Sequence, residues 1–192
     1  RWRILEVDTQ ARVVLLARAK GGKPPSFGGG PLGVHSIVHQ RMRQLLEESS
    51  VPVYLDAVAQ QGLLDAREAY ALFAFDRSPL IAAGDAVHLA HWAGQRVGLA
   101  IALWFQWLDV EAVNAGPFVE IIGVAEGEIP RLVDLALQRI PADVAILAAQ
   151  KEGLERNKFD QFLQPDLLVR GYAAAELDID GAIAVMKQWH AA

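Results

Sequence analysis

The chain has 192 residues, of which 53% are hydrophobic and 21% are charged, and it contains no cysteine. This length suits one medium-sized domain, or a small domain joined to part of another, and it buries enough surface to fold without disulfide bonds. The absence of cysteine excludes a disulfide framework, thiol catalysis and cysteine-ligated zinc. Taken alone, a formal net charge of −5 argues against nucleic acid as a partner.

The first predicted element is a β-hairpin. Residues 2–7 and 12–17 are rich in β-branched and apolar side chains, and a short polar segment separates them. Because a lone hairpin is only marginally stable, it must pack on the rest of this chain or on a part that precedes it. Residues 20–31 contain five glycines and three prolines, which exclude a helix or a central strand. We expect this loop to be the boundary between two modules.

Two helices are predicted after the loop. Residues 34–48 have helical periodicity, and one face of that helix is apolar. The predicted core face consists of Val34, Ile37, Val38, Met42, Leu45 and Leu46. A second helix is predicted over residues 56–74, with Asp56 as its N-cap.

The middle of the chain predicts a small sheet and a buried helix. Short apolar runs joined by turn residues predict two hairpins, formed by residues 80–83 with 86–92 and by residues 110–114 with 118–123. Residues 95–108 are apolar nearly all round, which is typical of a helix packed against a sheet. Two histidines three residues apart on one predicted strand should face opposite sides of this sheet, namely His88 and His91.

The last third of the chain is predicted to be helical, and this completes an α+β fold. Pro130 occupies an early helical position, where its missing N–H costs nothing, and Asp178 or Asp180 would cap the final helix. The four predicted helices span residues 129–140, 142–149, 159–174 and 181–189. We therefore expect a hairpin and loop from a small β-module over residues 1–31. A mixed domain with a four-strand sheet and about seven helices should follow over residues 32–192.

Motifs for catalysis are missing from the sequence. Gly21-Gly22-Lys23 is followed by Pro24, so it lacks the hydroxyl and the free N–H groups of a P-loop. His35 and His39 have the i, i+4 spacing of two metal ligands, but the glutamate of a metalloprotease is missing and no third ligand follows at a suitable distance. We expect no catalytic residue, metal site or cofactor in this chain.

The charge of the chain is distributed unevenly. Residues 1–46 carry eight Lys and Arg residues against two acidic residues, a net charge of +6, whereas residues 47–192 carry a net charge of −11. A basic quarter joined to an acidic remainder indicates a localised anionic partner, although solvated basic side chains are the alternative. Phosphate contacts and aromatic stacking would suit nucleic acid. The candidate nucleic-acid-binding residues are Arg18, Lys20, Lys23, Phe27, His35, His39, Arg41 and Arg43.

Several short motifs in one order resemble a known family. Two of them are Ala19-Lys20-Gly21-Gly22-Lys23-Pro24-Pro25-x-Phe27-Gly28-Gly29 and Val34-His35-x-x-Val38-x-Gln40-Arg41-Met42-Arg43. Further matches lie at residues 1–8, 52–56, 91–94, 158–168, 172–173 and 177–178. The set resembles the C-terminal accessory region of large bacterial superfamily 2 DEAD/DEAH-box helicases, including relatives of the large helicase-related proteins.

The resemblance implies that this chain followed two helicase domains that bind ATP and Mg²⁺. The parent would be a cytoplasmic, ATP-dependent hydrolase, and residues 1–30 would end a β-module that the preceding part completes. We expect no membrane contact, because the longest apolar run, residues 97–107, is shorter than the ~20 residues that span a bilayer.

Three function hypotheses follow. The first is an accessory domain that holds or steers DNA or RNA and packs on the helicase core of the parent chain. The second is a protein-interaction or scaffolding domain without nucleic-acid contact, whose acidic helical end docks the helicase core or another subunit. The third, a nuclease or hydrolase that uses His35 and His39, has the weakest support. The sequence leaves the oligomeric state open.

Overall fold

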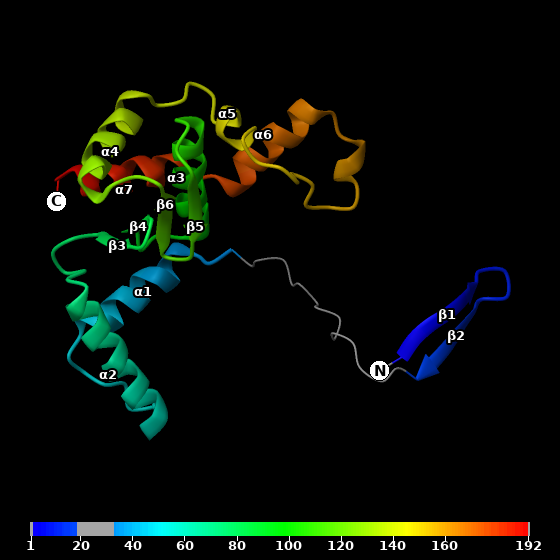
Figure 1. The fold of residues 1–192 in the computed structure, drawn as a ribbon, viewed down its shortest axis with the longest axis horizontal. Helices are drawn as coiled ribbons and strands as arrows, with labels where there is room; N and C mark the ends of the chain where they lie inside the picture. The colour runs from blue at the N-terminus through cyan, green and yellow to red at the C-terminus, as the bar shows by residue number, and fades with distance from the viewer. Residues whose placement is uncertain (1, 19–32, 192) are drawn as a thin grey trace. The chain divides into compact units, whose positions relative to one another are not determined.

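A computed structural model of the protein describes residues 2–18 and 33–191. The chain divides into two compact units, Arg1–Leu32 and Gly33–Ala192. The first contains a two-strand sheet, and the second contains a four-strand sheet and, among the described residues, seven α-helices (Figure 1). The predicted α+β fold class, with its N-terminal hairpin, is confirmed.

The hairpin consists of β1 (Trp2–Asp8) and β2 (Val13–Arg18), which pair antiparallel. The Asp8 carboxylate accepts hydrogen bonds from the backbone N–H groups of Gln10 and Ala11, at 2.9 and 2.8 Å, and so holds the turn. The register shifts between Ile4 and Glu6. This bulge matters because a one-residue shift moves side chains to the opposite face of a strand.

The bulge places five apolar side chains on one face of the hairpin, while Val13 and Leu15 lie on the other face opposite Asp8 and Glu6. Ile4 lies opposite Leu16 and Val7 lies opposite Val14, so residues three apart on β1 share a face. Trp2 extends the same face. All five side chains are exposed within the described part of this unit, so the hairpin buries little apolar surface by itself.

The second unit begins with two packed helices, α1 (Ser36–Glu47) and α2 (Ala57–Leu72). The predicted N-cap is confirmed, because the Asp56 carboxylate accepts a hydrogen bond from the N–H of Ala59 at 2.8 Å. Arg67 of α2 donates to the backbone carbonyls of Leu45 and Ser50, at 3.0 and 2.7 Å. These bonds satisfy acceptors at the C-terminal end of α1 and join the two helices.

The predicted core face of α1 is confirmed only at its C-terminal end. Val34, Ile37, Val38 and Met42 are exposed, and the buried residue of this helix is His39. Leu45 and Leu46 are half-buried, and Leu46 packs against Tyr70, Ala90 and Trp92. Periodicity correctly predicts a helix here, but the first half of α1 contacts the rest of the unit through the side that carries His39.

The four-strand sheet has the order β3-β4-β6-β5, and every pair is antiparallel. Its strands are β3 (Leu80–Ala83), β4 (Ala86–Ala90), β5 (Ala112–Ala115) and β6 (Phe118–Ile122). Val87 and Leu89 pair with Ile121 and Val119 on the buried face. On the other face His88 lies opposite Glu120, as alternation requires. His91 lies beyond the end of β4 and is buried, so its predicted place on the strand is wrong.

Helix α3 (Gln95–Trp107) fills the core, as its apolar sequence predicts. It packs on the sheet beside β5 and β6 and also contacts α5, α6 and α7. Trp104 and Phe105 have no solvent exposure, and the indole N–H of Trp104 donates to the Arg139 carbonyl at 3.2 Å. The buried indole therefore keeps its hydrogen bond, which removes the cost of burying an unpaired donor.

Four α-helices complete the unit. They are α4 (Ile129–Gln138), α5 (Ala145–Ala148), α6 (Pro165–Glu176) and α7 (Ile179–Ala191). Helix α5 is shorter than predicted, and α6 begins later, because Asp160 accepts backbone N–H groups in a local turn and Pro165 then opens the helix. Asp178 caps α7 through the N–H of Gly181 at 2.9 Å. Within the described ranges, no helix is long and apolar enough to cross a membrane.

A glycine in α3 provides a test of this packing. A Cβ on Gly98 would lie 2.6 Å from Nε2 of the buried His91 and would also clash with the Asn114 side chain. We therefore expect Gly98→Ala to lower the free energy of unfolding by about 1–3 kcal/mol, despite the better helix propensity of alanine. Urea unfolding monitored by circular dichroism measures the change.

Gly62 in α2 is the matched control, because a Cβ there would meet no atom within 4 Å. Gly62→Ala should raise the free energy of unfolding by about 0.5–1 kcal/mol, since only backbone entropy changes. Equal effects of the two substitutions would contradict the close packing around Gly98.

Candidate functional site

The structure separates the predicted nucleic-acid-binding residues of α1 from one another. His35 precedes the helix, and its Nδ1 accepts a hydrogen bond from the N–H of Ile37 at 3.2 Å, which is an N-cap role. His39 is only 5% exposed, and its Nδ1 is hydrogen-bonded to the Ala93 carbonyl. The expectation that His39 is a solvated, phosphate-contacting residue is therefore corrected, because the protein encloses its ring.

The two arginines of α1 are paired with carboxylates. Arg41 contacts Glu48 at 2.6 Å, and Nε of Arg43 contacts Glu47 at 2.8 Å. Glu47 also accepts the Tyr70 hydroxyl at 2.7 Å, and this hydrogen bond, helped by Arg43, holds the pKa of Glu47 below its usual value. The net charge of +6 over residues 1–46 therefore overstates the positive charge that α1 presents, because Glu47 and Glu48 lie outside that range.

The three described arginines of the hairpin have no ion-pair partner among the described residues. They are Arg3, Arg12 and Arg18, and all three are exposed. Trp2 lies directly opposite Arg18 in the β1–β2 register, and it is also exposed. The candidate residues Lys20, Lys23 and Phe27 lie outside the described residues.

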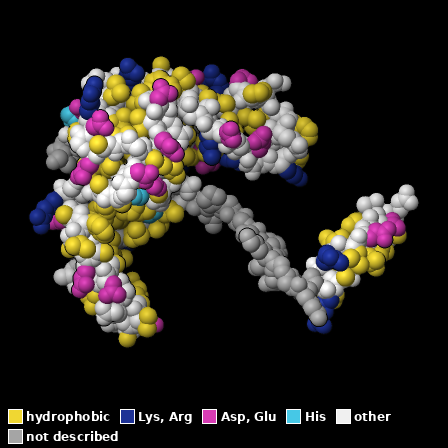
Figure 2. All heavy atoms as spheres, viewed as in Figure 1, with side chains coloured by type: hydrophobic (Ala, Val, Ile, Leu, Met, Phe, Trp, Pro, Cys, Tyr) yellow, Lys and Arg dark blue, Asp and Glu magenta, His cyan; other side chains and the backbone are white. Residues whose placement is uncertain are grey.

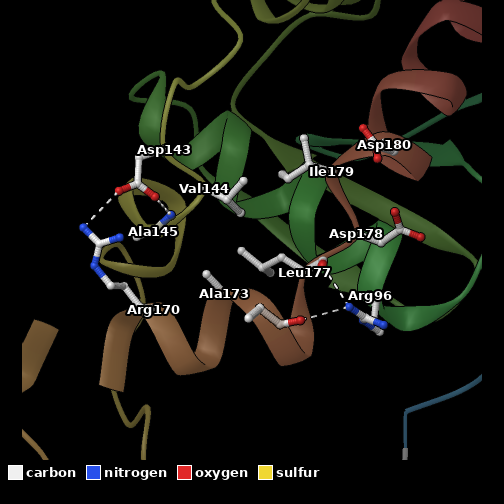
Figure 3. A pocket seen from close by; sticks show the side chains of 11 residues that line it. Arg96, Asp143, Val144, Ala145, Arg170, Ala173, Leu177, Asp178, Ile179 and Asp180 are labelled. Carbon is white, nitrogen blue, oxygen red and sulfur yellow. Dashed lines mark hydrogen bonds and ion pairs between the residues drawn. The ribbon is translucent and has the colours of Figure 1, made fainter. Parts of the chain in front are cut away.

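A cavity of about 630 Å³ in the second unit lies where α5, α6 and the start of α7 approach α3 (Figure 3). Arg96 donates to the backbone carbonyls of Ala174 and Leu177, at 3.3 and 3.1 Å, and so caps the end of α6. Asp143 pairs with Arg170 at 3.4 Å. Most charged groups of this cavity thus cap helix ends or form ion pairs with each other. The lining therefore indicates no particular ligand.

A smaller cavity, about 230 Å³, combines two arginines with aromatic rings. We name it the aromatic cavity. It is lined by Arg43, Phe75, Asp76, Arg77, Ser78, Pro79, Ala90, His91, Trp92, Val185, Gln188 and Trp189. Of the predicted candidate residues that the structure describes, Arg43 is the one that lies here. Sequence reasoning missed Arg77, Trp92 and Trp189, because no local pattern links the α2–β3 connection, the end of β4 and α7.

His91 is a buried histidine at the junction of these elements. Its Nδ1 accepts the N–H of Ala93 at 3.0 Å, so the proton of the neutral ring is on Nε2. Nε2 of His91 and Oδ1 of Asn114 both lie beside Gly98, and neither has a hydrogen-bond partner in the described part of the chain. Burial, with a smaller contribution from nearby His39, lowers the pKa of His91 to about 4. His91 is thus neutral at physiological pH.

No group of three or more His, Cys, Asp or Glu side chains arranged to hold a metal ion occurs in the part of the chain that the structure describes. Comparisons of the sequence with protein-family models and with curated proteins, and of the structure with solved structures, found no match. The candidate residues are therefore judged from their geometry and chemistry.

The buried His91 predicts a pH-dependent stability. In the unfolded chain the ring titrates near 6.5, so the unfolded state binds more protons than the folded state between pH 6.5 and pH 4. The contribution of neutral His91 should be complete above pH 6.5 and should fall with pH, by about 3 kcal/mol at pH 4. Urea unfolding across this range measures the free energy, and His91→Gln should reduce the slope.

Proton NMR titration of the His91 ring in the folded protein provides an independent measurement. A ring that titrates near 6.5, or an unchanged slope in His91→Gln, would contradict burial as the cause.

Proposed function

We propose that this chain is an accessory domain of an ATP-dependent DEAD/DEAH-box helicase and that it contributes nucleic-acid binding. The observation that carries the proposal is the strand register at the open end of the hairpin. Trp2 and Arg18 lie opposite each other, Arg3 follows Trp2 on the other face of the strand, and all three side chains are exposed. In the sequence, Lys20 and Lys23 follow Arg18.

This arrangement has the chemistry that a single strand of DNA or RNA requires. Lysines and arginines that contact phosphates dominate affinity, and a base that stacks on an exposed aromatic ring adds about 1–3 kcal/mol. The arginines of the hairpin have no carboxylate partner among the described residues, so no existing ion pair must be broken before they bind phosphate. The charge of −11 over residues 47–192 would repel a polyanion and favour contact at the basic N-terminal part.

The motif order along the chain supports the helicase assignment by resemblance. In this proposal ATP and Mg²⁺ bind in the helicase core domains of the parent protein. This chain holds or steers the nucleic acid, and its own residues take no part in ATP hydrolysis.

A protein-interaction domain is the second candidate function, because α1 and α2 expose a large apolar surface. Val58 is 81% exposed and Leu72 is 80% exposed, and Ile37 and Val38 of α1 are also exposed. Figure 2 shows hydrophobic side chains over this pair of helices. Large exposed apolar patches are typical of interaction sites. In this alternative the helicase core of the same parent protein covers α1 and α2, and the chain does not bind nucleic acid.

Salt dependence tests the nucleic-acid proposal. Fluorescence anisotropy should show that labelled oligothymidylate binds the full chain less tightly as NaCl increases, because binding releases counterions. Combined replacement of Arg3, Arg18, Lys20 and Lys23 by alanine should reduce the log–log slope by about 0.7 for each phosphate contact removed. Oligouridylate measured in parallel compares RNA with DNA.

Arg131→Ala is the matched control, since Arg131 is exposed on α4 and lies outside the basic quarter. It should leave the slope unchanged. Salt-insensitive binding, or no binding to either oligonucleotide, would contradict the proposal.

The second candidate is tested with Val58→Ser and Leu72→Ser, which reduce the apolar character of α2 at two exposed positions. If the helicase core of the parent protein covers α2, calorimetry should show at least tenfold weaker binding of the double variant to that core. Thermal stability serves as the control and should not change, because both side chains are exposed. Unchanged affinity for the core would contradict docking through α2.

A further inference from the structure

The aromatic cavity is built from four segments that are far apart in the sequence. Helix α1 contributes Arg43, the α2–β3 connection contributes residues 75–79, the end of β4 contributes residues 90–92, and α7 contributes Gln188 and Trp189 among others. Its volume, about 230 Å³, is small enough for a single planar ring system rather than an extended ligand. The volume therefore favours a compact group.

Three aromatic side chains line the cavity and are held in place. The ring centroids of Phe75 and Trp92 are 5.9 Å apart, and the ring planes are nearly perpendicular. The indole N–H of Trp189 donates to the Ala90 carbonyl at 3.0 Å. Trp189 is only partly buried, whereas Trp92 is buried. Trp189 therefore keeps a minor exposed part, which is where a base could contact it.

Cationic groups lie beside these rings. The ion pairs of Arg43 with Glu47 and of Arg77 with Asp76 both use the Nε atom of the arginine, so the Nη groups are outside these pairs. The Arg77 side chain is 81% exposed. Among the described residues, the lining contains two arginines, Arg43 and Arg77, and one carboxylate, Asp76. Glu47 pairs with Arg43 from outside the lining, so the two ion pairs balance the charge and a phosphate would bind at the Nη groups that they leave open.

Neutral hydrogen-bonding groups complete the lining. The amide of Gln188 and the hydroxyl of Ser78 can donate as well as accept, which suits the mixed donor and acceptor edge of a nucleobase. A purely anionic ligand would use the arginines but not the aromatic rings. A purely apolar ligand would leave the arginines unpaired.

The backbone around the cavity is unusual. Trp92 and Ala74, the residue before Phe75, both have positive φ, 47° and 53°. A bulky side chain rarely adopts this conformation, which the surrounding structure must enforce. At Trp92 it accompanies the chain reversal between β4 and α3, and it sets the direction in which the indole meets the cavity.

We propose that the aromatic cavity binds one unstacked nucleotide of a single-stranded nucleic acid, with the base against Trp189 and the adjacent phosphate at Arg43 and Arg77. A base inside a duplex is stacked on both sides, so a paired strand is excluded from this site. The inference rests on the proposed nucleic-acid binding and names a second contact, on the second unit, for the same ligand.

Abasic oligonucleotides distinguish the contribution of the base to the binding affinity from the contribution of the phosphates. With the full chain, oligothymidylate should bind about tenfold more tightly than an abasic oligonucleotide of equal length, because stacking on one ring has about that effect. Trp189→Leu should reduce this difference to the part that stacking on Trp2 of the hairpin contributes. Trp189→Phe loses the same hydrogen bond to Ala90 but keeps a ring, so it should retain most of the difference. Circular dichroism verifies that both variants are folded.

Arg77→Ala tests the phosphate contact. It should weaken binding of both oligonucleotides severalfold, whereas Arg131→Ala, which removes a charge elsewhere on the second unit, should not. Binding of thymidine monophosphate is the last measurement. The mononucleotide should bind much more weakly than the oligonucleotide, because it lacks the other phosphate contacts.

The outcomes distinguish this inference from the proposed function. Equal binding of the normal and abasic strands, or an unchanged difference in Trp189→Leu, overturns the nucleotide site and leaves nucleic-acid binding by the hairpin intact. Binding of the monophosphate as tight as that of the strand overturns the assignment to a single strand. Absence of binding to every oligonucleotide overturns both proposals.

Discussion

Burial of helix α3 is the constraint on which the second unit depends. This helix is apolar on nearly every side, so it is stable only when other elements cover it. The sheet covers one side, beside β5 and β6, and α5, α6 and α7 cover others. Fully burying a side chain such as Phe105 contributes about 1.5–3 kcal/mol, and eight residues of this helix are buried.

The segment that leads into α3 is hydrogen-bonded to the start of α1 and fixes its position. Gly94 donates to Oγ of Ser36 at 2.9 Å, and Gln95 donates to the Val34 carbonyl at 2.8 Å. A Cβ on Gly94 would lie 2.7 Å from the Ser36 nitrogen, so only glycine permits this approach. His39 is hydrogen-bonded to the Ala93 carbonyl of the same segment, so α1 is held on the side that carries His39. This placement of α1 brings Arg43 to the cavity that Trp92 also lines.

Local ion pairing changes how the charge of the chain should be understood. Adding formal charges treats every arginine of residues 1–46 alike. The structure shows that Arg41 and Arg43 are neutralised by Glu48 and Glu47, which follow directly after the basic quarter. The hairpin arginines have no such neighbour among the described residues. The unbalanced charge is therefore displaced toward the N-terminus, where the proposed phosphate contacts lie.

By itself, the sequence determined the elements whose signals are local. Turn residues, helical period and caps such as Asp56 predict the hairpins and most helices, and the apolar run predicts that α3 is buried. Tertiary structure alone decided which face of α1 is covered, that His39 and His91 are enclosed, and that Arg43, Arg77 and Trp189 line one cavity. The reason is physical: periodicity describes one element, whereas burial depends on which other elements pack against it.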